Sequence, residues 1–281
     1  MTNTASSPST GLKPITTRPG LREYLGELRD RSEYIRAVPL GELRAQNLDT
    51  VLGNLWFFLT PLLQTGVFFL IFGVLLEIDR GVGNYPVYLI IGVLVFRFFS
   101  QSLTGSTRTM RRNETLMRSL YFPRAIIPLA STLSNFYAFI PGVVIMLAMV
   151  VITGEPPSWR WLVLPVPMLF TLVFVAGVSL IMARLGHRYP DLENALPPII
   201  RLGFYGSGVL YAPEAFTSNE TVLTLFDINP MYQLISLFRW SLMAQPMPDW
   251  FWLSSAAYAV ITFVFGFVYF WQNELSYGSQ R

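Results

Sequence analysis

Six blocks of apolar residues, most of them about 20 residues long, determine what this chain can fold into. A helix that crosses about 30 Å of hydrocarbon needs roughly 20 apolar residues, and a helix satisfies its backbone polar groups within one segment. The fifth block is the shortest and carries Pro197, Pro198 and Arg201. We therefore predict an all-α polytopic membrane protein with six transmembrane helices, at residues 55–76, 86–107, 125–152, 161–183, 195–211 and 250–271.

The composition agrees with a membrane protein and excludes several kinds of site. Only 13% of the residues are charged and 52% are apolar, whereas a soluble domain carries about 25% charged residues. The chain has no cysteine, which excludes disulfides, thiolate metal sites and a cysteine nucleophile. His187 is the only histidine, so no histidine-rich metal site is expected.

Basic residues indicate which loops lie in the cytoplasm, because cytoplasmic loops near span ends carry an excess of Lys and Arg. Five arginines crowd the loop between the second and third blocks: Arg108, Arg111, Arg112, Arg118 and Arg124. The stretch before the first block is also basic, whereas the opposite loops hold only Arg80, Arg160 and Arg239. Both termini are therefore predicted to be cytoplasmic.

The N-terminal region is expected to have two parts. Residues 1–20 are polar and lack the apolar core of a signal peptide, which indicates a disordered cytoplasmic tail. Residues 21–50 are interpreted as an interface segment, because Leu21, Tyr24, Leu25, Leu28 and Ile35 share one helical face. This pattern favours an amphipathic helix on the cytoplasmic membrane surface. A helix packed on a soluble partner is the alternative.

The segment between the fifth and sixth blocks, residues 212–249, is too long for a simple loop. An apolar amphipathic stretch at residues 231–243 lies between Asn229-Pro230 and Gln245-Pro246. Thirteen residues rise only about 20 Å as a helix, so this stretch is predicted to enter the outer leaflet and return as re-entrant helices. A plug packed against the other helices is the alternative. Residues 51–272 thus form the predicted transmembrane domain, and residues 273–281 a short cytoplasmic tail.

The sequence carries no signature of its own energy source or active site. A P-loop needs Gly-Lys-Ser/Thr, but the only lysine lies in Gly11-Leu12-Lys13-Pro14. Proton-driven carriers usually hold an acid or a histidine inside the bilayer, and the interiors of the six blocks hold none. We therefore expect a chain that is not an enzyme and has no cofactor, with energy supplied by a separate subunit.

Four motifs, in order along residues 40–270, resemble ABC-2 type exporter permeases. They are Leu52-Gly53-Asn54-Leu55-Trp56 before Pro61, Tyr121-Phe122-Pro123-Arg124 before Ala125, Arg188-Tyr189-Pro190-Asp191-Leu192 before Tyr205, and Asn229-Pro230-Met231 before Arg239. Pro190 departs from the family pattern, which often has a polar residue there. Within the family the chain looks most similar to the polysaccharide-export branch of Wzm and TarG type permeases. Its arginine-rich, lysine-poor composition suits an actinobacterial member that exports the galactan precursor of arabinogalactan.

The resemblance implies a homodimer in the bacterial inner membrane. Two copies of a nucleotide-binding ABC ATPase would drive it and would hold ATP and Mg, and the substrate would be a polysaccharide linked to polyprenyl pyrophosphate. No nucleic-acid partner is expected. A permease for teichoic acid, a drug or a small lipid shares the same motifs. A membrane-embedded enzyme of wall synthesis and a passive channel are alternatives from other classes.

The resemblance also implies coupling helices that contact the ATPase. We place the first at residues 113–120, where Asn113 suits an N-cap and Glu114 suits the first turn of a helix. The contacts would come from Glu114, Leu116, Met117, Arg118 and Leu120. A solvated basic loop that only sets topology is the alternative. A second contact is placed around His187, Arg188 and Asp191.

A sugar polymer needs a wide path with aromatic walls. The candidate path residues are Phe136, Tyr137, Phe204, Tyr205 and, in the second block, Arg97. Arg97 should face the bundle interior, a dimer seam or a watery path, because a central arginine is costly in lipid. It has two equally supported roles: contact with the substrate, or bonds to backbone carbonyls that lock the helices. Arg29, Arg36 and Arg44 are candidates for the pyrophosphate or for lipid headgroups.

Overall fold

The computed structural model describes residues 20–31, 52–75, 82–119, 122–274 and 277, and the regular structure within these ranges is helical. The helices are α1 (Leu21–Asp30), α3 (Trp56–Phe69), α4 (Tyr85–Arg112), α5 (Glu114–Ser119), α6 (Ile126–Ile152), α7 (Pro165–Arg188), α8 (Leu192–Gly206), α9 (Glu220–Ile228), α10 (Pro230–Met243) and α11 (Trp250–Trp271). A π-helical stretch, Leu70–Leu75, continues α3, and short 3-10 turns cover Gly53–Leu55, Trp159–Val163 and Pro213–Ala215.

Four of the predicted spans have helices that are long and apolar enough to cross a membrane. These helices are α4, α6, α7 with the 3-10 turn before it, and α11. The first and fifth predicted spans correspond to α3 and α8, which are shorter and have prolines within them: Pro61 in α3, and Pro197 and Pro198 in α8. The predicted helical, polytopic architecture is thus confirmed in its coarse form.

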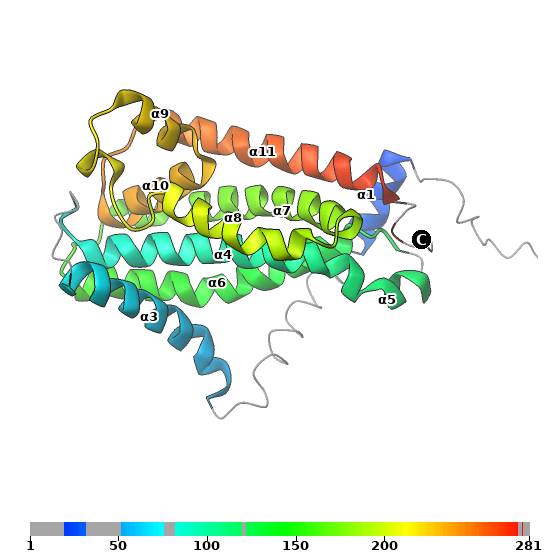
Figure 1. Cartoon of the computed structure of the whole chain (residues 1–281), viewed down its shortest axis with the longest axis horizontal. Coiled ribbons are helices and arrows are strands. Elements are labelled where there is room, and N and C mark those ends of the chain that lie inside the picture. Colours follow the sequence, from blue (N-terminus) through cyan, green and yellow to red (C-terminus); the bar gives the residue numbers. More distant parts are fainter. Residues whose placement is uncertain (1–19, 32–51, 76–81, 120–121, 275–276, 278–281) are drawn as a thin grey trace, which may run out of the picture.

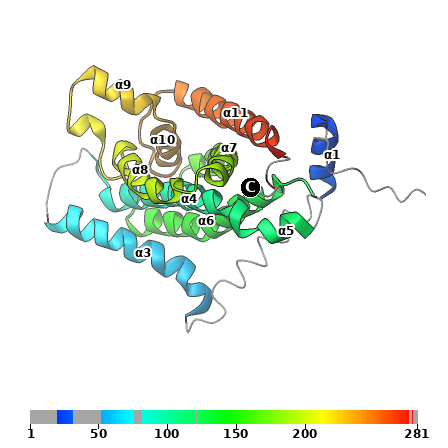
Figure 2. The same ribbon diagram turned by 45° about the vertical axis from the view of Figure 1, so that its right-hand side comes forward.

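Helices α4, α6, α7, α8 and α11 run side by side along the longest axis of the molecule (Figure 1). Helices α1 and α5 and the end of α11 lie at one end of this bundle, which we call the α5 end. Helices α9 and α10 lie at the other end, which we call the α9 end. Helix α3 lies beside α4 and α6, on the side away from α11, in both views (Figure 2).

Helix α4 is the centre of the packing. Nearly all of its side chains from Val87 to Phe98 are buried, and buried residues of α6, α7 and α10 pack against them. The ring of Phe98 stacks on Phe139 of α6, with ring centroids 5.4 Å apart. Because its neighbours surround it, α4 can carry polar side chains only where the bundle leaves space for them.

Glycines allow α7 and α11 to approach closely. A Cβ atom added to Gly177 of α7 would lie 2.5 Å from the backbone nitrogen of Phe263, and one added to Gly266 of α11 would lie 2.3 Å from the Gly177 carbonyl oxygen. Small residues at a helix crossing bring two backbones into van der Waals contact, which supports association where lipid surrounds the helices. The α7–α11 contact is therefore direct backbone packing.

The amphipathic stretch predicted after the fifth span is helix α10. The Asn229 side chain caps it by accepting a hydrogen bond from the backbone N–H of Met231, and Pro230 occupies the first turn. Ala244 ends the helix with a left-handed φ of 56°. Most of its side chains are buried against α4, α7 and the turn before α7. This burial favours the alternative of a plug packed against the other helices.

The predicted N-terminal amphipathic helix is present as α1, but its apolar face is divided. Tyr24 and Leu28 are buried against the bundle, where the Tyr24 ring lies 6.0 Å from that of Phe267 in α11. Leu21 and Leu25 remain exposed. Part of that face therefore holds α1 on the protein itself, and the other part lies at the surface of the chain. The rest of the predicted interface segment, residues 32–50, lies outside the described residues, as do residues 1–19.

Candidate functional site

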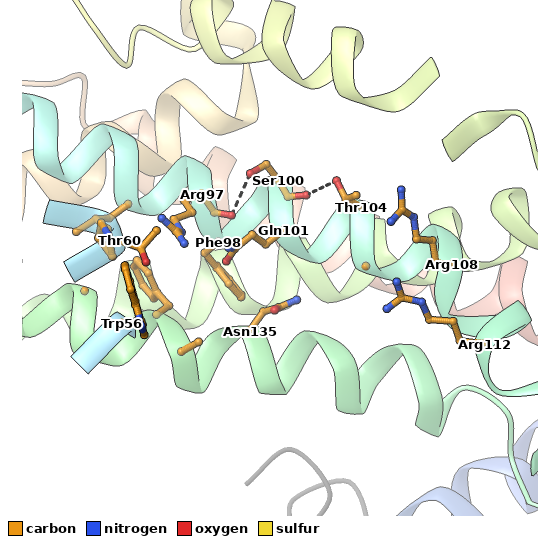
Figure 3. A pocket seen from close by; sticks show the side chains of 16 residues that line it. Trp56, Thr60, Arg97, Phe98, Ser100, Gln101, Thr104, Arg108, Arg112 and Asn135 are labelled. Carbon is orange, nitrogen blue, oxygen red and sulfur yellow. Dashed lines mark hydrogen bonds between the residues drawn. The ribbon is translucent and has the colours of Figure 1, made fainter. Parts of the chain in front are cut away.

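A stripe of polar side chains runs along α4 toward the α5 end. It consists of Arg97, Ser100, Gln101, Thr104, Arg108 and Arg112. A spacing of three or four residues places side chains on one face of a helix, and Figure 3 shows them in a row along α4. Such a polar face needs protein or water beside it, because hydrocarbon cannot satisfy its hydrogen bonds.

The stripe lines a first cavity of about 560 Å³ between α3, α4 and α6 (Figure 3). Trp56 and Thr60 of α3 and Asn135 and Phe139 of α6 form the facing walls. Within the described part of the chain, the lining contains three arginines and no acidic residue. The first cavity is therefore electropositive, with polar and aromatic walls.

A second cavity of about 450 Å³ lies between α3, α4 and α8, and it shares Arg97, Ser100 and Thr104 with the first. Phe204 and Tyr205 of α8 line it. The structure thus brings together three of the residues predicted for the substrate path: Arg97, Phe204 and Tyr205.

The other two predicted path residues lie elsewhere. Phe136 packs beside Phe98 and Phe139, with ring centroids 5.7 and 6.3 Å away, and Tyr137 is half-buried on α6. Neither side chain lines the first or the second cavity. The α6 positions that line the first cavity are Asn135, Ala138, Phe139 and Gly142, which recur at helical spacing. The sequence could have indicated Asn135, because it is the one amide side chain in the block at residues 125–152.

Arg97 joins two helices as well as two cavities. Its Nη1 donates a hydrogen bond to Oε1 of Gln64 on α3 at 3.1 Å. In one of the two roles considered from the sequence, Arg97 locks the helices by bonding to backbone carbonyls. The hydrogen bond in the structure is instead to the side chain of Gln64. Because Arg97 also lines both cavities, it lies between α3 and the polar space along α4.

The predicted first coupling helix is present as α5, directly after α4. Asn113, predicted as an N-cap, lies between the end of α4 and the beginning of α5. Its Nδ2 donates to the Thr109 carbonyl oxygen at 2.8 Å, and so satisfies the end of α4. Glu114 lies in the first turn of α5 and is exposed.

Met117, predicted to contact the ATPase, is only 3% exposed and is buried within the chain at the α5 end, in the same cluster as Met110 and Phe122. It therefore fixes α5 to the bundle instead of offering a surface. The side chains of Leu116, Arg118 and Leu120 lie outside the described residues. Among the predicted contacts, Glu114 is thus the one whose described side chain is exposed.

The predicted second contact lies at the turn between α7 and α8. Arg188, Tyr189 and Asp191 are exposed there, and the His187 ring packs edge-on against Tyr277 with ring centroids 5.2 Å apart. The turn is therefore at the surface of the α5 end, whereas His187, just before it, packs on Tyr277 near the C-terminus.

Just after this turn, Glu193 of α8 forms ion pairs with two arginines of the α4 stripe region. Its Oε2 lies 3.3 Å from Nε of Arg108, and its Oε1 accepts a hydrogen bond from Nη2 of Arg111. All three side chains are partly exposed. These ion pairs connect α8 to α4 next to the first cavity, which Arg108 lines.

A buried hydrogen-bond network fastens three distant segments at the α5 end. Tyr24 OH of α1 donates to Glu274 Oε2 at 2.8 Å, and the backbone N–H of Arg124 donates to Glu274 Oε1 at 2.9 Å. The Ala125 N–H donates to Tyr24 OH at 3.1 Å, and an Arg124 guanidinium nitrogen donates to the Glu274 carbonyl oxygen. We call Tyr24, Arg124, Ala125 and Glu274 the α1 clamp.

Burial is the main electrostatic influence on the α1 clamp. It raises the pKa of Glu274 above its usual range, although the Arg124 N–H, the Tyr24 hydroxyl and the Arg124 charge act in the opposite direction. Burial, followed by the charge of Glu274, raises the pKa of the Tyr24 hydroxyl. Tyr24 thus stays protonated and able to donate.

The three predicted headgroup arginines are only partly described. Arg29 lies in the last turn of α1 and is exposed, and it lines neither of the two cavities along α4. Arg36 and Arg44 lie outside the described residues.

Arg239, which the sequence placed in an outer loop, is instead buried in α10 with 2% exposure. Its guanidinium carbon lies 3.2 Å from the centroid of the Tyr88 ring, and Nη2 donates to the carbonyl oxygens of Tyr88 and Val209 at 3.3 and 3.1 Å. Gly92 leaves space for it, since a Cβ there would lie 2.9 Å from Nη2. Arg239 therefore holds α10 against α4.

A third cavity of about 830 Å³ lies at the α9 end, and its lining includes Arg239, Glu214 and Asp227. Glu214 accepts a hydrogen bond from Tyr232 OH at 3.1 Å. Across the described ranges, no group of three or more His, Cys, Asp and Glu side chains is placed to hold a metal ion.

A comparison with known protein families identifies the family of this helical bundle. Residues 40–243 match the family model for the ABC-2 type transporter. The chain belongs to that family. The matched region runs from before α3 to the end of α10 and so includes both cavities along α4, α5 and the α7–α8 turn.

This ABC-2 family chain is similar to proteins named for the export or transport of O-antigen and polysialic acid. It is 26% identical over 208 residues to the O-antigen export system permease protein RfbA of Myxococcus xanthus, covering 74% of this chain and 79% of that one. It is 27% identical over 199 residues to RfbA of Klebsiella pneumoniae, covering 70% and 75%. It is 22% identical over 212 residues to the polysialic acid transport protein KpsM of Escherichia coli, covering 74% and 81%.

Proposed function

We propose that this chain is the membrane permease subunit of an ATP-driven exporter that moves a polysaccharide on polyprenyl pyrophosphate out of the cytoplasm. The observation that carries the proposal is the ABC-2 family match over a region that contains an electropositive, aromatic-walled space along α4. The names of the relatives, O-antigen export and polysialic acid transport, support a polysaccharide as the cargo. The arginine-rich, lysine-poor composition suits an actinobacterial member of the family, and on that resemblance galactan is the proposed polymer.

The proposed topology has six spans, with α3 and α8 as the first and fifth. The α5 end faces the cytoplasm, since it carries Arg108, Arg111, Arg112 and Arg124 near span ends. α9 and α10 then lie on the outer side, with α10 packed as a plug against the other helices, and both termini are cytoplasmic in the inner membrane.

Two copies would form the working permease, meeting on the side of α3 and α8. Both cavities lie between these helices and α4, so a second copy would enclose the polar stripe from the side. Leu63 and Val67 of α3 and Leu202 of α8 are exposed apolar residues that a partner or lipid would cover. The sugar rings would pass along Trp56, Phe204 and other aromatic walls.

Two copies of an ABC ATPase would bind the α5 end and hold ATP and Mg. Their contacts would be α5, with Glu114 at its exposed first turn, and the exposed α7–α8 turn. Met117 and the α1 clamp would transmit the displacement of α5 to the bundle, because they fix its surroundings to α11.

Reconstitution in proteoliposomes tests this function. The chain and its ATPase should move a lipid-linked glycan across the bilayer only when ATP is present, and the chain alone should move none. ATP-independent transport by the chain alone would contradict the proposal. Transport of a teichoic acid, a drug or a small lipid in place of the glycan would identify one of the other ABC-2 substrates.

The ATPase contact can be tested by reversing one charge. Glu114→Lys should weaken ATPase binding and lower export at least about tenfold, because a like-charge contact opposes docking. Glu220→Lys is the matched control, since Glu220 is an exposed first-turn glutamate of α9 at the opposite end. Equal export by the two variants would refute the role of α5.

A further inference from the structure

The ion pairs at Glu193 join a carboxylate to an arginine pair whose geometry suits another anion. Each oxygen of Glu193 lies against a different guanidinium, Oε2 against Arg108 and Oε1 against Arg111. Paired arginines of this kind also bind phosphate oxygens, because the planar guanidinium donates two parallel hydrogen bonds. We infer that Arg108 and Arg111 are the site at which the diphosphate of the lipid-linked substrate first binds, and that Glu193 occupies this site until the diphosphate displaces it.

The charge distribution around this site supports a phosphate ligand. Arg112 and Arg97 line the first cavity beyond Arg108, and Arg97 also lines the second, where Arg201 joins it. Neither lining, in the portion of the chain described, includes an acidic residue. Glu193 therefore partly neutralises the arginines at the α5 end of the two cavities. A diphosphate that replaced Glu193 would find the further arginines of the cavity linings beside it.

The ion pairs of Glu193 are weak enough for a diphosphate to displace the carboxylate. The Arg108 and Arg111 side chains are 41% and 36% exposed, and Glu193 is 24% exposed. Ion pairs with this much water access contribute little, because solvent screens them. A diphosphate carries more negative charge than one carboxylate and has more acceptor oxygens, so it can compete for the same guanidinium groups.

The position of Glu193 gives the exchange a mechanical consequence. Glu193 lies in the first turn of α8, two residues after Asp191 of the exposed α7–α8 turn. Displacement of Glu193 would free the beginning of α8 from α4, beside the second cavity that both helices line. Binding of the substrate headgroup would thus loosen the segment that, in the proposed function on which this inference rests, contacts the ATPase.

Equilibrium binding of radiolabelled undecaprenyl pyrophosphate to the permease–ATPase complex in lipid nanodiscs tests the site. Glu193→Gln should bind about fivefold more tightly than wild type, since it removes two weak competing pairs. Arg108→Ala/Arg111→Ala should bind at least about tenfold more weakly. Unchanged binding by either variant would overturn the inference.

Controls separate the site from general charge effects and from misfolding. Arg22→Ala/Arg31→Ala removes two positive charges from exposed positions at α1 and should leave binding as in wild type; an equal loss there would overturn the inference. Arg108→Lys/Arg111→Lys keeps the charge but not the fork geometry, so it should bind with intermediate affinity. Wild-type affinity in the lysine variant would refute recognition by paired guanidinium groups.

Competitors identify the source of the diphosphate. Unlabelled undecaprenyl pyrophosphate should displace the label, and phosphatidylglycerol at the same mole fraction should not. Equal displacement by phosphatidylglycerol, or by inorganic pyrophosphate at the same concentration, would refute a lipid-linked diphosphate as the ligand. If the wild type exports glycan with ATP but no variant changes diphosphate binding, this inference alone is overturned. If the wild type exports no glycan, the proposed function is overturned.

Discussion

Replacing Tyr24 with Phe removes one hydroxyl that serves two partners of the α1 clamp. In the wild type this hydroxyl donates to the buried carboxylate of Glu274 and accepts the N–H of Ala125. The substitution keeps the ring, its burial and its contact with Phe267. The expected effect therefore comes from hydrogen bonding alone and concerns the attachment of α1 to the bundle.

The size of the effect follows from the groups left without partners. A hydrogen bond to a charged group contributes about 1.5–3 kcal/mol, and a buried N–H left without an acceptor costs about 1–3 kcal/mol. Glu274 keeps the N–H of Arg124, and water can enter where the hydroxyl was, so the loss is smaller than the sum. We expect Tyr24→Phe to weaken the attachment of α1 by about 2–4 kcal/mol.

Hydrogen exchange followed by mass spectrometry measures this attachment directly, because local opening controls the exchange of α1 amides. A loss of 2 kcal/mol raises the exchange rate of peptides that cover residues 20–31 by about 30-fold. Tyr269→Phe is the control, since its hydroxyl makes no hydrogen bond within the described part of the chain and its ring stays over Arg184. Exchange in Tyr24→Phe that matches wild type would refute the clamp.

The remaining predictions concern pH, packing and transport. Folding raises the pKa of the Glu274 carboxyl, so the folded state binds the carboxyl proton more tightly than the unfolded state does. The free energy of unfolding should therefore fall as the pH rises above the ordinary pKa of 4.5. Glu274→Gln should flatten this pH dependence when unfolding is measured by denaturant titration at several pH values. Gly177→Ala must separate α7 from α11 by about 1 Å near Phe263 and should cost about 1–3 kcal/mol in thermal unfolding, whereas Gly66→Ala, where a Cβ meets open space, should not. Arg97→Gln should lower export at least about tenfold while Arg97→Lys retains more of it, because charge beside both cavities attracts the diphosphate; equal export by both would contradict an electrostatic role.

Local sequence signals predicted the features that local physics determines. The boundary at Asn229-Pro230 placed the beginning of α10, and apolar block length placed α4, α6, α7 and α11. The resemblance to the ABC-2 family, with Asn113 and Glu114 as local support, placed α5. The block lengths and boundaries need only neighbouring residues.

Long-range contacts account for what the sequence did not predict. Tyr24 and Glu274 lie 250 positions apart, so no periodicity links them. Met117 was assigned to a docking surface because it is apolar and lies in a basic loop, but the space left by α1 and α11 buries it. Arg239 looked like an outer-loop charge, and only the absence of a side chain at Gly92 makes room for it inside. These positions follow from the packing of whole helices.

The sidedness of α5 is the most direct test of the account, and the absence of cysteine from the chain makes it practical. Glu114→Cys should resist a membrane-impermeant maleimide in intact cells, react with it in inverted membrane vesicles, and lose that reactivity when the ATPase is bound. Labelling of this cysteine from outside intact cells, or labelling in vesicles that the ATPase leaves unchanged, would contradict a permease driven from its cytoplasmic α5 end.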